Sequence, residues 1–456
     1  MDKKPVVAVF DVGKTNKKLL LFDEQYNVVF ERSARFLETK DEDGDSCENL
    51  ESLRLSVFDS LHEVFRKNEF EIKAINFTTY GASFVYLDEN GRPLTPLYNY
   101  LKSYPKCLSE QLYINYGGEE QFSLQTASPA LGSLNSGLQL YRMKYEKPEV
   151  FNQITHALHL PQYMSYLLSG RMYSDMTSIG CHTALWSFED KKYHDWVFKE
   201  GLDKKLAPIL ESDQTFSPAF LGNDYVIGIG LHDSSSALIP YLVNFTEPFI
   251  LLSTGTWAIS FNPFNSSPLS PEELEKDCLF YLNYKGNPVK ASRLFLGNEH
   301  DIQAKRIADF FGVSPVYFRT LTIDWSFVEK FASEFNGQLD AFSKLELSIF
   351  ESPNQAYHAL MVALVDAQIQ ALNLVENPKV PIKRLFVDGG FSKNQIFMSL
   401  LANRLSGIEV YAASMAQATA LGAAMVIHDQ WNSQPVPRDL IHLKYFARKS
   451  ENGQGN

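Results

Sequence analysis

Residues 6–22, VVAVFDVGKTNKKLLLF, decide the fold of this chain. A continuous apolar, β-prone run at residues 6–10 leads into a glycine turn at residues 11–16, and a second apolar run follows at residues 19–22. Another turn at residues 23–27 leads to a third β-prone run at residues 28–31. This pattern predicts strands joined by tight turns, the first of which carries Asp11 at the end of a buried strand.

The same strand–glycine turn–strand pattern recurs about half the chain later. Residues 249–261, FILLSTGTWAISF, again place a glycine turn between two apolar runs. The self-similarity of the letters is weak, but the repeated arrangement predicts two related halves.

Helices alternate with strands over the rest of the chain. The apolar stripe of residues 50–68 predicts an amphipathic helix, the steps of three and four in residues 353–375 predict a long buried helix, and residues 160–168 predict a helix that stops at Gly170. Residues 84–87 and 94–97 flank an Asn-Gly turn and predict a hairpin, while residues 111–203 look mostly helical. The C-terminal part predicts strand 384–387, helix 394–405, strand 409–411 and a small-residue helix at 416–427. The expected fold class is α/β.

Composition limits the classes of partner. The 456 residues include 42 basic and 54 acidic side chains, which gives a net charge of −12, and 45% of the residues are hydrophobic. A chain this long and apolar buries a large core in two or three domains. The acidic balance argues against a nucleic-acid binder, but not against phosphates held locally by backbone amides or a metal.

The cysteines and the absence of long apolar runs bear on location. Cys47, Cys107, Cys181 and Cys278 form no C-x-x-C pair and are expected to be reduced thiols. The first apolar run is too short for a secretory signal, and no run of 18 apolar residues predicts a membrane span. We expect a cytoplasmic protein without a membrane partner.

Three segments carry candidate chemistry, and each has a structural alternative. Asp11 can reach a hydrated Mg²⁺, although a single such turn is more often a hairpin with a capping aspartate. Asp233, in GLHDSSSA (230–237), can act as a general base for an alcohol or simply cap a helix. Gly389 and Gly390, in RLFVDGG (384–390), allow close approach of a phosphate or flat ring at a helix N-terminus, or form a tight turn.

Other ligand signatures are weak or missing. His156 and His159 have metal-ligand spacing, but no third ligand is apparent, so zinc is not expected. The sequence has no G-x-x-x-x-G-K-[ST] and no G-x-G-x-x-G, so neither a P-loop nor a Rossmann cofactor site is supported.

The ordered set of motifs resembles the FGGY carbohydrate kinases of the actin–hexokinase ATPase superfamily. The resemblance runs from Asp11 to about His428 and is carried by DVGKT (11–15), HD (232–233), LSTGTW (252–257), DGG (388–390) and ATALGAA (418–424). Within the family the chain is most similar to the L-rhamnulose and L-fuculose kinases, through TTYG (78–81), HALHLPQYMSYLLSGRM (156–172) and GLHDSSSA (230–237).

This resemblance implies two RNase H-like domains that flank a catalytic cleft. Residues 1–245 would bind mainly the sugar and supply the base, and residues 246–456 would bind mainly ATP. The acceptor would be a small ketose such as rhamnulose, fuculose or xylulose, and a homodimer is left open.

The resemblance also implies roles for individual residues. Asp233 matches the catalytic base, Asp11 matches the carboxylate that holds Mg²⁺ through water, and the sugar-side positions are Gly81, His232 and Ser234. The positions expected near ATP and its phosphates are Gly13, Lys14, Thr15, Lys18, Gly255, Thr256, Gly389, Gly390 and Asn394.

Several positions depart from the family pattern, mostly on the sugar side. The phosphate loop reads Lys14-Thr15-Asn16 instead of small hydroxyl residues, Ala82-Ser83 follows Gly81 where Val-Asp is common, and YLKSY (100–104) replaces an Arg-Asp-x-Arg pattern. Leu294 stands where an asparagine is usual, and Gln417 replaces a common glutamate.

The leading hypothesis is therefore an ATP- and Mg²⁺-dependent ketose kinase. The alternatives are a non-catalytic sugar or nucleotide sensor on the same fold and, less favoured, an actin-like filament protein.

Overall fold

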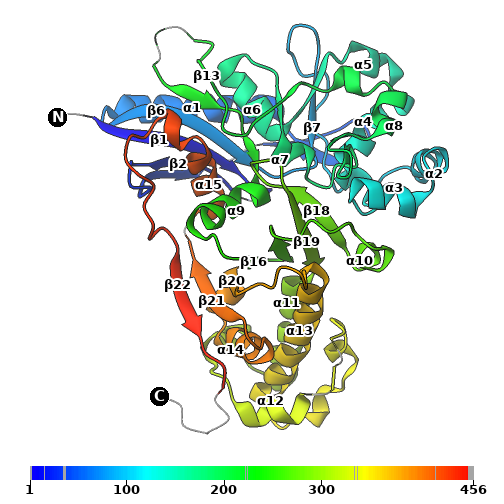
Figure 1. Ribbon diagram of the computed structural model, residues 1–456, viewed down its shortest axis with the longest axis vertical. Coiled ribbons are helices and arrows are strands. Elements are labelled where there is room, and N and C mark those ends of the chain that lie inside the picture. The colour runs from blue at the N-terminus through cyan, green and yellow to red at the C-terminus, as the bar shows by residue number, and fades with distance from the viewer. Residues whose placement is uncertain are drawn as a thin grey trace.

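The computed structural model describes residues 3–14, 16–33, 37–220, 222, 224–332, 334–335, 337–415 and 417–449. The chain forms two lobes, each built on one large mixed sheet (Figure 1). The first sheet has the strand order β13 (Thr215–Phe216), β14 (Val226–Gly228), β6 (Phe70–Thr79), β1 (Lys4–Val12), β2 (Lys17–Phe22) and β3 (Val28–Ser33), and β15 (Leu231–His232) also pairs with β6.

The second sheet repeats this plan. Its strand order is β18 (Cys278–Leu282), β19 (Pro288–Leu294), β17 (Ala258–Asn262), β16 (Phe249–Thr254), β20 (Arg384–Gly389), β21 (Glu409–Ser414) and β22 (His442–Phe446). In the first sheet, β1 pairs antiparallel with β2 and parallel with β6. In the second sheet, β16 pairs in the same way, antiparallel with β17 and parallel with β20. The expectation of two related halves is confirmed by this shared topology.

Helices cover both faces of the first sheet, which explains why residues 6–10 of β1 are all apolar. Val6, Ala8 and Phe10 of β1 pack into the core under α1 (Leu50–Lys67) and α6 (Leu160–Ser169). Val7 and Val9 point to the other face, toward α9 (Asp233–Asn244) and α15 (Ala418–Val426). A strand covered on both faces has no solvent side, so the sequence shows no alternation.

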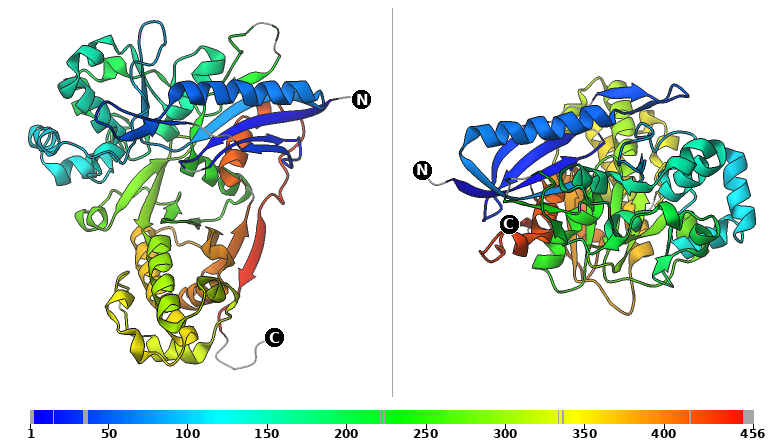
Figure 2. Two further views of the ribbon diagram at one scale, coloured as in Figure 1. Left: turned by 180° about the vertical axis from the view of Figure 1, so that it is seen from behind. Right: turned by 90° about the horizontal axis from the view of Figure 1, so that it is seen from above.

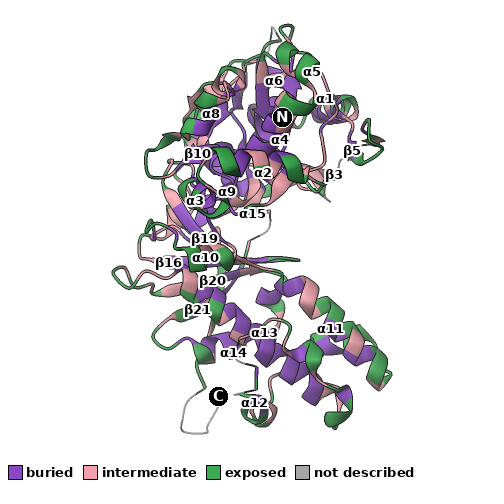
Figure 3. Cartoon of the chain, turned by 90° about the vertical axis from the view of Figure 1, so that its right-hand side faces the viewer, coloured by how far each residue is buried: buried purple, intermediate pink, exposed green. Residues whose placement is uncertain are grey.

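A long helix forms the core of the second lobe. Helix α13 (Pro353–Val375) has the length and mean hydropathy of a membrane span, but 72% of its most apolar window is buried inside the protein. It packs with α11 (Leu296–Phe311), α12 (Trp325–Phe331) and α14 (Gln395–Arg404) on one face of the second sheet (Figure 3). Its bounds match those predicted from the apolar steps.

Helices α9 and α15 lie between the two sheets (Figures 1 and 2). Ile239 of α9 belongs to the core against the first sheet, whereas Leu238 and Tyr241 belong to the core against the second. Helix α15 follows the last parallel strand of the second sheet, yet it packs on β1 and β6 of the first. The second half of the chain therefore supplies part of the first lobe's covering.

The remaining elements extend mainly the first lobe. The helices are α2 (Lys106–Asn115), α3 (Glu119–Thr126), α4 (Ser136–Glu146), α5 (Pro148–Gln153), α7 (Met176–Ile179), α8 (Asp195–Lys199) and α10 (Pro271–Glu275). The short strands pair as β4 (Glu38–Lys40) with β5 (Ser46–Glu48), β7 (Phe84–Leu87) with β8 (His156–His159), β9 (Ser174–Asp175) with β12 (Ile209–Leu210), and β10 (Trp186–Ser187) with β11 (Lys192–Tyr193).

The hairpin predicted around the Asn-Gly turn is wrong in its second arm. The turn forms, since the Gly91 N–H donates to the Asp88 carbonyl, but strand β7 pairs along its length with β8. Residues 94–97 form no strand. The arm makes only isolated contacts: the Leu94 N–H donates to the Tyr86 carbonyl at 2.9 Å, and Leu97 bridges to Glu48. Pro93 and Pro96 lack the N–H groups that a continuous ladder needs.

The close contact of α9 with α15 depends on Gly422. A Cβ at this position would overlap the backbone carbonyl oxygen of Ser236 in α9. We expect Gly422→Ala to lower the free energy of unfolding by about 2–4 kcal/mol, because backbone cannot move aside cheaply. Alanine in an ordinary helix interior would instead stabilise by about 1 kcal/mol. Urea unfolding measures the change.

Gly201→Ala is the matched control. Gly201 has φ +68° and no atom within 4 Å of the added Cβ, so the expected loss is only the strain of left-handed backbone, about 1–2 kcal/mol. A Gly422→Ala protein as stable as wild type would mean that the helices can separate without loss.

Candidate functional site

Asp233 lies where strand β15 gives way to helix α9, next to His232. Its side chain is 26% exposed, although protein surrounds it on most sides. Burial raises the pKa of this carboxyl to about 6 despite the opposing bonds from Ser234. A carboxylate of this kind is ionised near neutral pH and still basic enough to take a proton.

The hydrogen bonds of Asp233 all fall on one oxygen. Oδ1 accepts from the Ser234 N–H at 2.6 Å and the Ser234 hydroxyl at 3.3 Å, and His232 Nε2 lies 3.2 Å away. Oδ2 has no partner among the residues that the structure describes. The fixed oxygen orients the carboxylate, and the other oxygen is left for a substrate hydroxyl.

His232 is a buried and neutral neighbour. Burial lowers its pKa to about 3, and its ring stacks on Tyr281 of the second lobe with 5.7 Å between centroids. Its Nε2 lies 3.1 Å from the Cys181 sulfur. A Cβ on Gly81 would lie 2.6 Å from that sulfur and 3.0 Å from the His232 ring, so Gly81 is required for this packing.

Asp11 lies at the end of β1 and faces the same region. The Thr419 hydroxyl of α15 donates to its Oδ2 at 2.6 Å. Burial raises the pKa of Asp11 to about 6; the Thr419 bond opposes this shift, the Asp233 charge adds to it, and Lys18 lowers the pKa. Two buried carboxylates this close mark a place with uncompensated negative charge.

These residues fit a hydrated Mg²⁺ that arrives with a nucleotide. No cluster of three His, Cys, Asp or Glu ligands occurs among the described residues, and Mg²⁺ is commonly held by one or two carboxylates, waters and substrate phosphates. Asp11 Oδ1 has no partner within the described part of the chain and is the oxygen that would hold it. A cation there would also lower the pKa of Asp11.

The lysines predicted for the phosphates have protein partners. Lys14 Nζ lies 3.6 Å from Glu48 and over the rings of Tyr80 and Tyr100, and Lys18 Nζ lies 2.7 Å from Glu31. The Gly13 N–H closes its turn onto Asn16 O at 2.8 Å. Thr15 lies outside the described residues, so contacts of this loop with phosphates stay a prediction.

A cavity of about 640 Å³ opens in the second lobe. Four predicted residues line it together, from two connections: Gly255 and Thr256 follow β16, and Gly390 and Asn394 lie between β20 and α14. The Gly255 N–H bonds Trp257 O at 2.8 Å, and Asn394 caps helix α14. The size is that of a small-ligand site.

One wall of this cavity is aromatic and hydrogen bonded. The Tyr357 hydroxyl lies 2.9 Å from Asn394 Nδ2 and 3.0 Å from His300 Nε2, and the Tyr357 ring stacks on Phe318 at 4.5 Å. Phe391 lies edge-on to His300. Flat rings and a few oriented polar atoms are what a purine base requires.

Gly389 lies at the end of β20, directly before Gly390, and packs closely on the neighbouring strand. Its φ is +88°, and a Cβ would overlap the Thr254 carbonyl of the neighbouring strand β16. Its neighbour Asp388 accepts from the Gly389 N–H at 2.6 Å and from the Tyr241 hydroxyl of α9 at 3.5 Å. The glycine turn is thus tied to the helix that carries Asp233.

Sequence reasoning missed several residues of the site. Thr419 lies in the ATALGAA (418–424) motif of the resemblance, which was assigned no site residue, so its hydroxyl could have been noticed. Tyr80 lies in the TTYG (78–81) motif, where only Gly81 was assigned a role. Glu48, Cys181, Tyr281 and His300 gave no signal, because single polar or aromatic residues far apart in the chain form no local pattern.

Comparison with known proteins agrees with this geometry. Residues 6–218 match the FGGY family of carbohydrate kinases, N-terminal domain, and residues 246–435 match the carbohydrate kinase FGGY, C-terminal domain. A rhamnulokinase of Oceanobacillus iheyensis is 23% identical over 423 residues, which are 85% of this chain and 86% of that protein.

Solved structures share the fold over nearly the whole chain. A carbohydrate kinase from Novosphingobium aromaticivorans superposes with a TM-score of 0.79 at 22% identity, covering 98% of this chain and 95% of that one. A ligand-bound xylulose kinase from Lactobacillus acidophilus gives 0.80 at 16% identity, with 98% and 94% covered. At such identities the likeness shows the fold alone.

The two family matches together span both lobes, and the expected two-domain fold of the actin–hexokinase type is confirmed. The chain belongs to the FGGY family of carbohydrate kinases and is a sugar phosphotransferase.

Proposed function

We propose that the chain transfers the γ-phosphoryl group of ATP to a hydroxyl of a small ketose, with Asp233 as the general base. The observation that carries this proposal is the oriented Asp233 carboxylate, with a pKa of about 6 and a free Oδ2, beside Asp11. The similarity to a rhamnulokinase supports a ketose, and family membership in the kinases outweighs the sensor alternative.

Each group has a defined task in this mechanism. Asp233 Oδ2 takes the proton of the acceptor hydroxyl while its Oδ1 stays fixed by Ser234 and His232. Mg²⁺, when bound at Asp11, offsets charge on the phosphates. Neutral His232 orients the base without competing for the proton.

The lobes would divide the substrates at about residue 245. The division into residues 1–245 and 246–456 is supported by the two sheets, which draw their strands from the two sides of this point. Helix α15 is the exception, because it packs on the first sheet. The aromatic cavity of the second lobe would hold adenosine. We also propose that the protein is cytoplasmic.

Removing the base should abolish most turnover. Asp233→Asn keeps the size and bonds of the side chain but cannot accept the proton, so kcat should fall about 10²–10⁴-fold. ADP release with ATP, Mg²⁺ and a ketose panel measures the effect. Asp59→Asn, on the exposed face of α1, is the control. An unchanged rate in Asp233→Asn would contradict the assignment of the base.

The pH dependence follows from the raised pKa of Asp233. The base must be ionised, so kcat/KM should be level above pH 6 and fall about tenfold per pH unit below it. Excess Mg²⁺ should lower the pKa of Asp11, so that only the ionisation of Asp233 shapes the pH profile of kcat/KM. Initial rates from pH 4.5 to 8 test this. If kcat/KM instead begins to fall only near pH 4, burial does not raise the pKa of the base.

The cavity of the second lobe should be required for nucleotide binding only. No atom lies within 4 Å of a Cβ built on Gly390, so Gly390→Val should fold and fill part of the cavity. We expect the KM for ATP to rise about tenfold or more, a change of about 1.4 kcal/mol or more, with the KM for the sugar nearly unchanged. Calorimetry with ATP checks the affinity. Unchanged ATP binding would place the nucleotide elsewhere.

A further inference from the structure

Tyr100 and Lys14 pack on Tyr80 and form one wall with it. Tyr80 precedes Gly81, and a Cβ built on Gly81 would lie 3.0 Å from the ring of His232, the neighbour of Asp233. The Tyr100 ring meets the Tyr80 ring edge-on at 5.6 Å, and Lys14 Nζ lies 5.7 Å from the centre of the first ring and 5.5 Å from the centre of the second. Burial and then the charge of Asp233 raise the pKa of Tyr100. Tyr100 therefore lies within the electric field of the proposed base.

A buried carboxylate fixes the lysine of this wall. The Glu48 side chain is 4% exposed and lies 3.6 Å from Lys14 Nζ and 3.2 Å from Lys17 Nζ. Burial and then the charge of Glu48 raise the pKa of Tyr80. Lys14 is thereby held on the acceptor side, under the two tyrosine rings.

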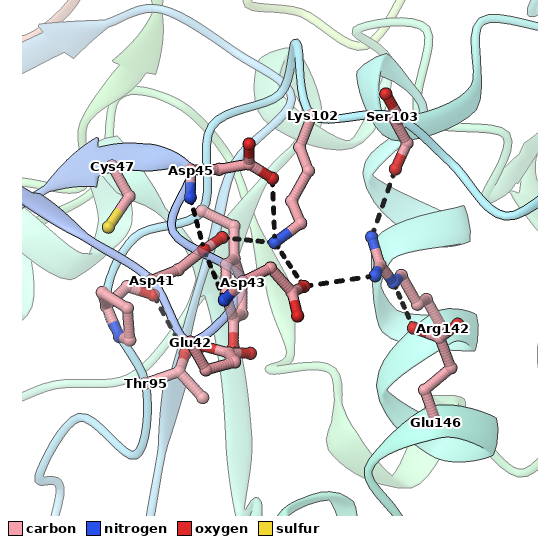
Figure 4. Close-up of polar contacts among 12 residues, drawn as sticks. Asp41, Glu42, Asp43, Asp45, Cys47, Thr95, Lys102, Ser103, Arg142 and Glu146 are labelled. Atoms are coloured by element: carbon pink, nitrogen blue, oxygen red, sulfur yellow. Dashed lines mark hydrogen bonds and ion pairs between the residues drawn. The ribbon is translucent and has the colours of Figure 1, made fainter.

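A second group of carboxylates fixes the segment that carries Tyr100. Lys102, two residues further on, is 8% exposed and contacts three aspartates of one loop: its Nζ bonds Asp41 and lies 2.7 Å from Asp43 and 3.2 Å from Asp45 (Figure 4). Burial raises the pKa of Asp41, but the Lys102 bond and the N–H groups of Asp45 and Asp43 outweigh this and lower it. Such a charge pair needs its partner, because a lone buried charge is costly.

Both groups belong to the β4–β5 hairpin. Asp41, Asp43 and Asp45 lie in its turn, and Glu48 ends its second strand. Backbone bonds join Glu48 to Leu97, and Arg142 Nη1 donates to the Ser103 carbonyl at 3.3 Å (Figure 4). The hairpin thus holds Leu97, Lys102 and Lys14, while Arg142 of helix α4 holds Ser103.

We propose that Tyr100, supported by Lys14, is the residue that discriminates among acceptor sugars, and that Lys102 is a positioning residue that acts through it. A phenol ring presents a flat apolar face with a polar edge, which suits the C–H face of a sugar ring or chain. This segment is YLKSY (100–104), where the chain departs from the charged pattern of its family. The inference rests on the proposed kinase function.

The experiment is a double-mutant cycle on the KM for the best acceptor of a ketose panel. Lys102→Met should raise that KM about tenfold while the KM for ATP stays near wild type. Tyr100→Ala should raise it at least as much and reduce the differences among sugars in the panel. If Lys102 acts through Tyr100, the double variant should match Tyr100→Ala alone. Lys73→Met, which removes an exposed ion pair with Glu71 in the same lobe, is the control and should change nothing.

The outcomes separate the inference from the function. Independent effects that multiply in the double variant, or a wild-type acceptor KM in Lys102→Met, would overturn the inference while the kinase activity stands. A wild-type chain that phosphorylates no sugar would overturn the proposed function, and this inference with it. If Lys102→Met does not fold, Asp43→Asn with Asp45→Asn replaces it: both side chains are half-exposed, and the acceptor KM should rise in the folded variant.

Discussion

The close packing of helix α9 against helix α15 is the constraint on which the rest of this structure depends. Gly422 allows the two backbones to touch, and the Ser236 hydroxyl donates to the Thr419 carbonyl at 2.7 Å. Because Thr419 in turn bonds Asp11, the helix that carries Asp233 and the strand that carries Asp11 are set relative to each other. Residues from both ends of the chain are thus fixed around one pair of carboxylates.

The cost of burying these carboxylates explains their chemistry. Asp11 and Asp233 both have a pKa of about 6, since burial disfavours their charges. Among the residues that the structure describes, neither aspartate forms an ion pair with a charged basic side chain, and one oxygen of each has no hydrogen-bond partner. In the proposed reaction, a metal-bound polyanion and an acceptor hydroxyl would supply these partners. A net charge of −12 is compatible with a nucleotide substrate for this reason.

The acceptor side is built differently from the nucleotide side. The cavity proposed for the nucleotide, in the second lobe, is formed by turns of the repeated sheet plan, at Gly255, Gly390 and Asn394. The wall at Tyr100 depends on a hairpin inserted between β3 and α1, whose carboxylates hold lysines from two other segments (Figure 4). An inserted hairpin can change without disturbing the sheet, so substrate choice can vary while the phosphoryl-transfer geometry stays.

The sequence by itself determined the local order of elements, both glycine turns, the long helix α13 and the α/β class, because apolar periodicity and turn residues act over a few neighbouring positions. It also indicated Asp233 and Asp11 through ordered motifs. Only the tertiary structure decided that Thr419 bonds a residue 408 positions away, that β7 pairs with β8, and that Lys14 lies on Tyr100 under Glu48. Such contacts depend on how distant elements pack, and no spacing in the chain encodes them.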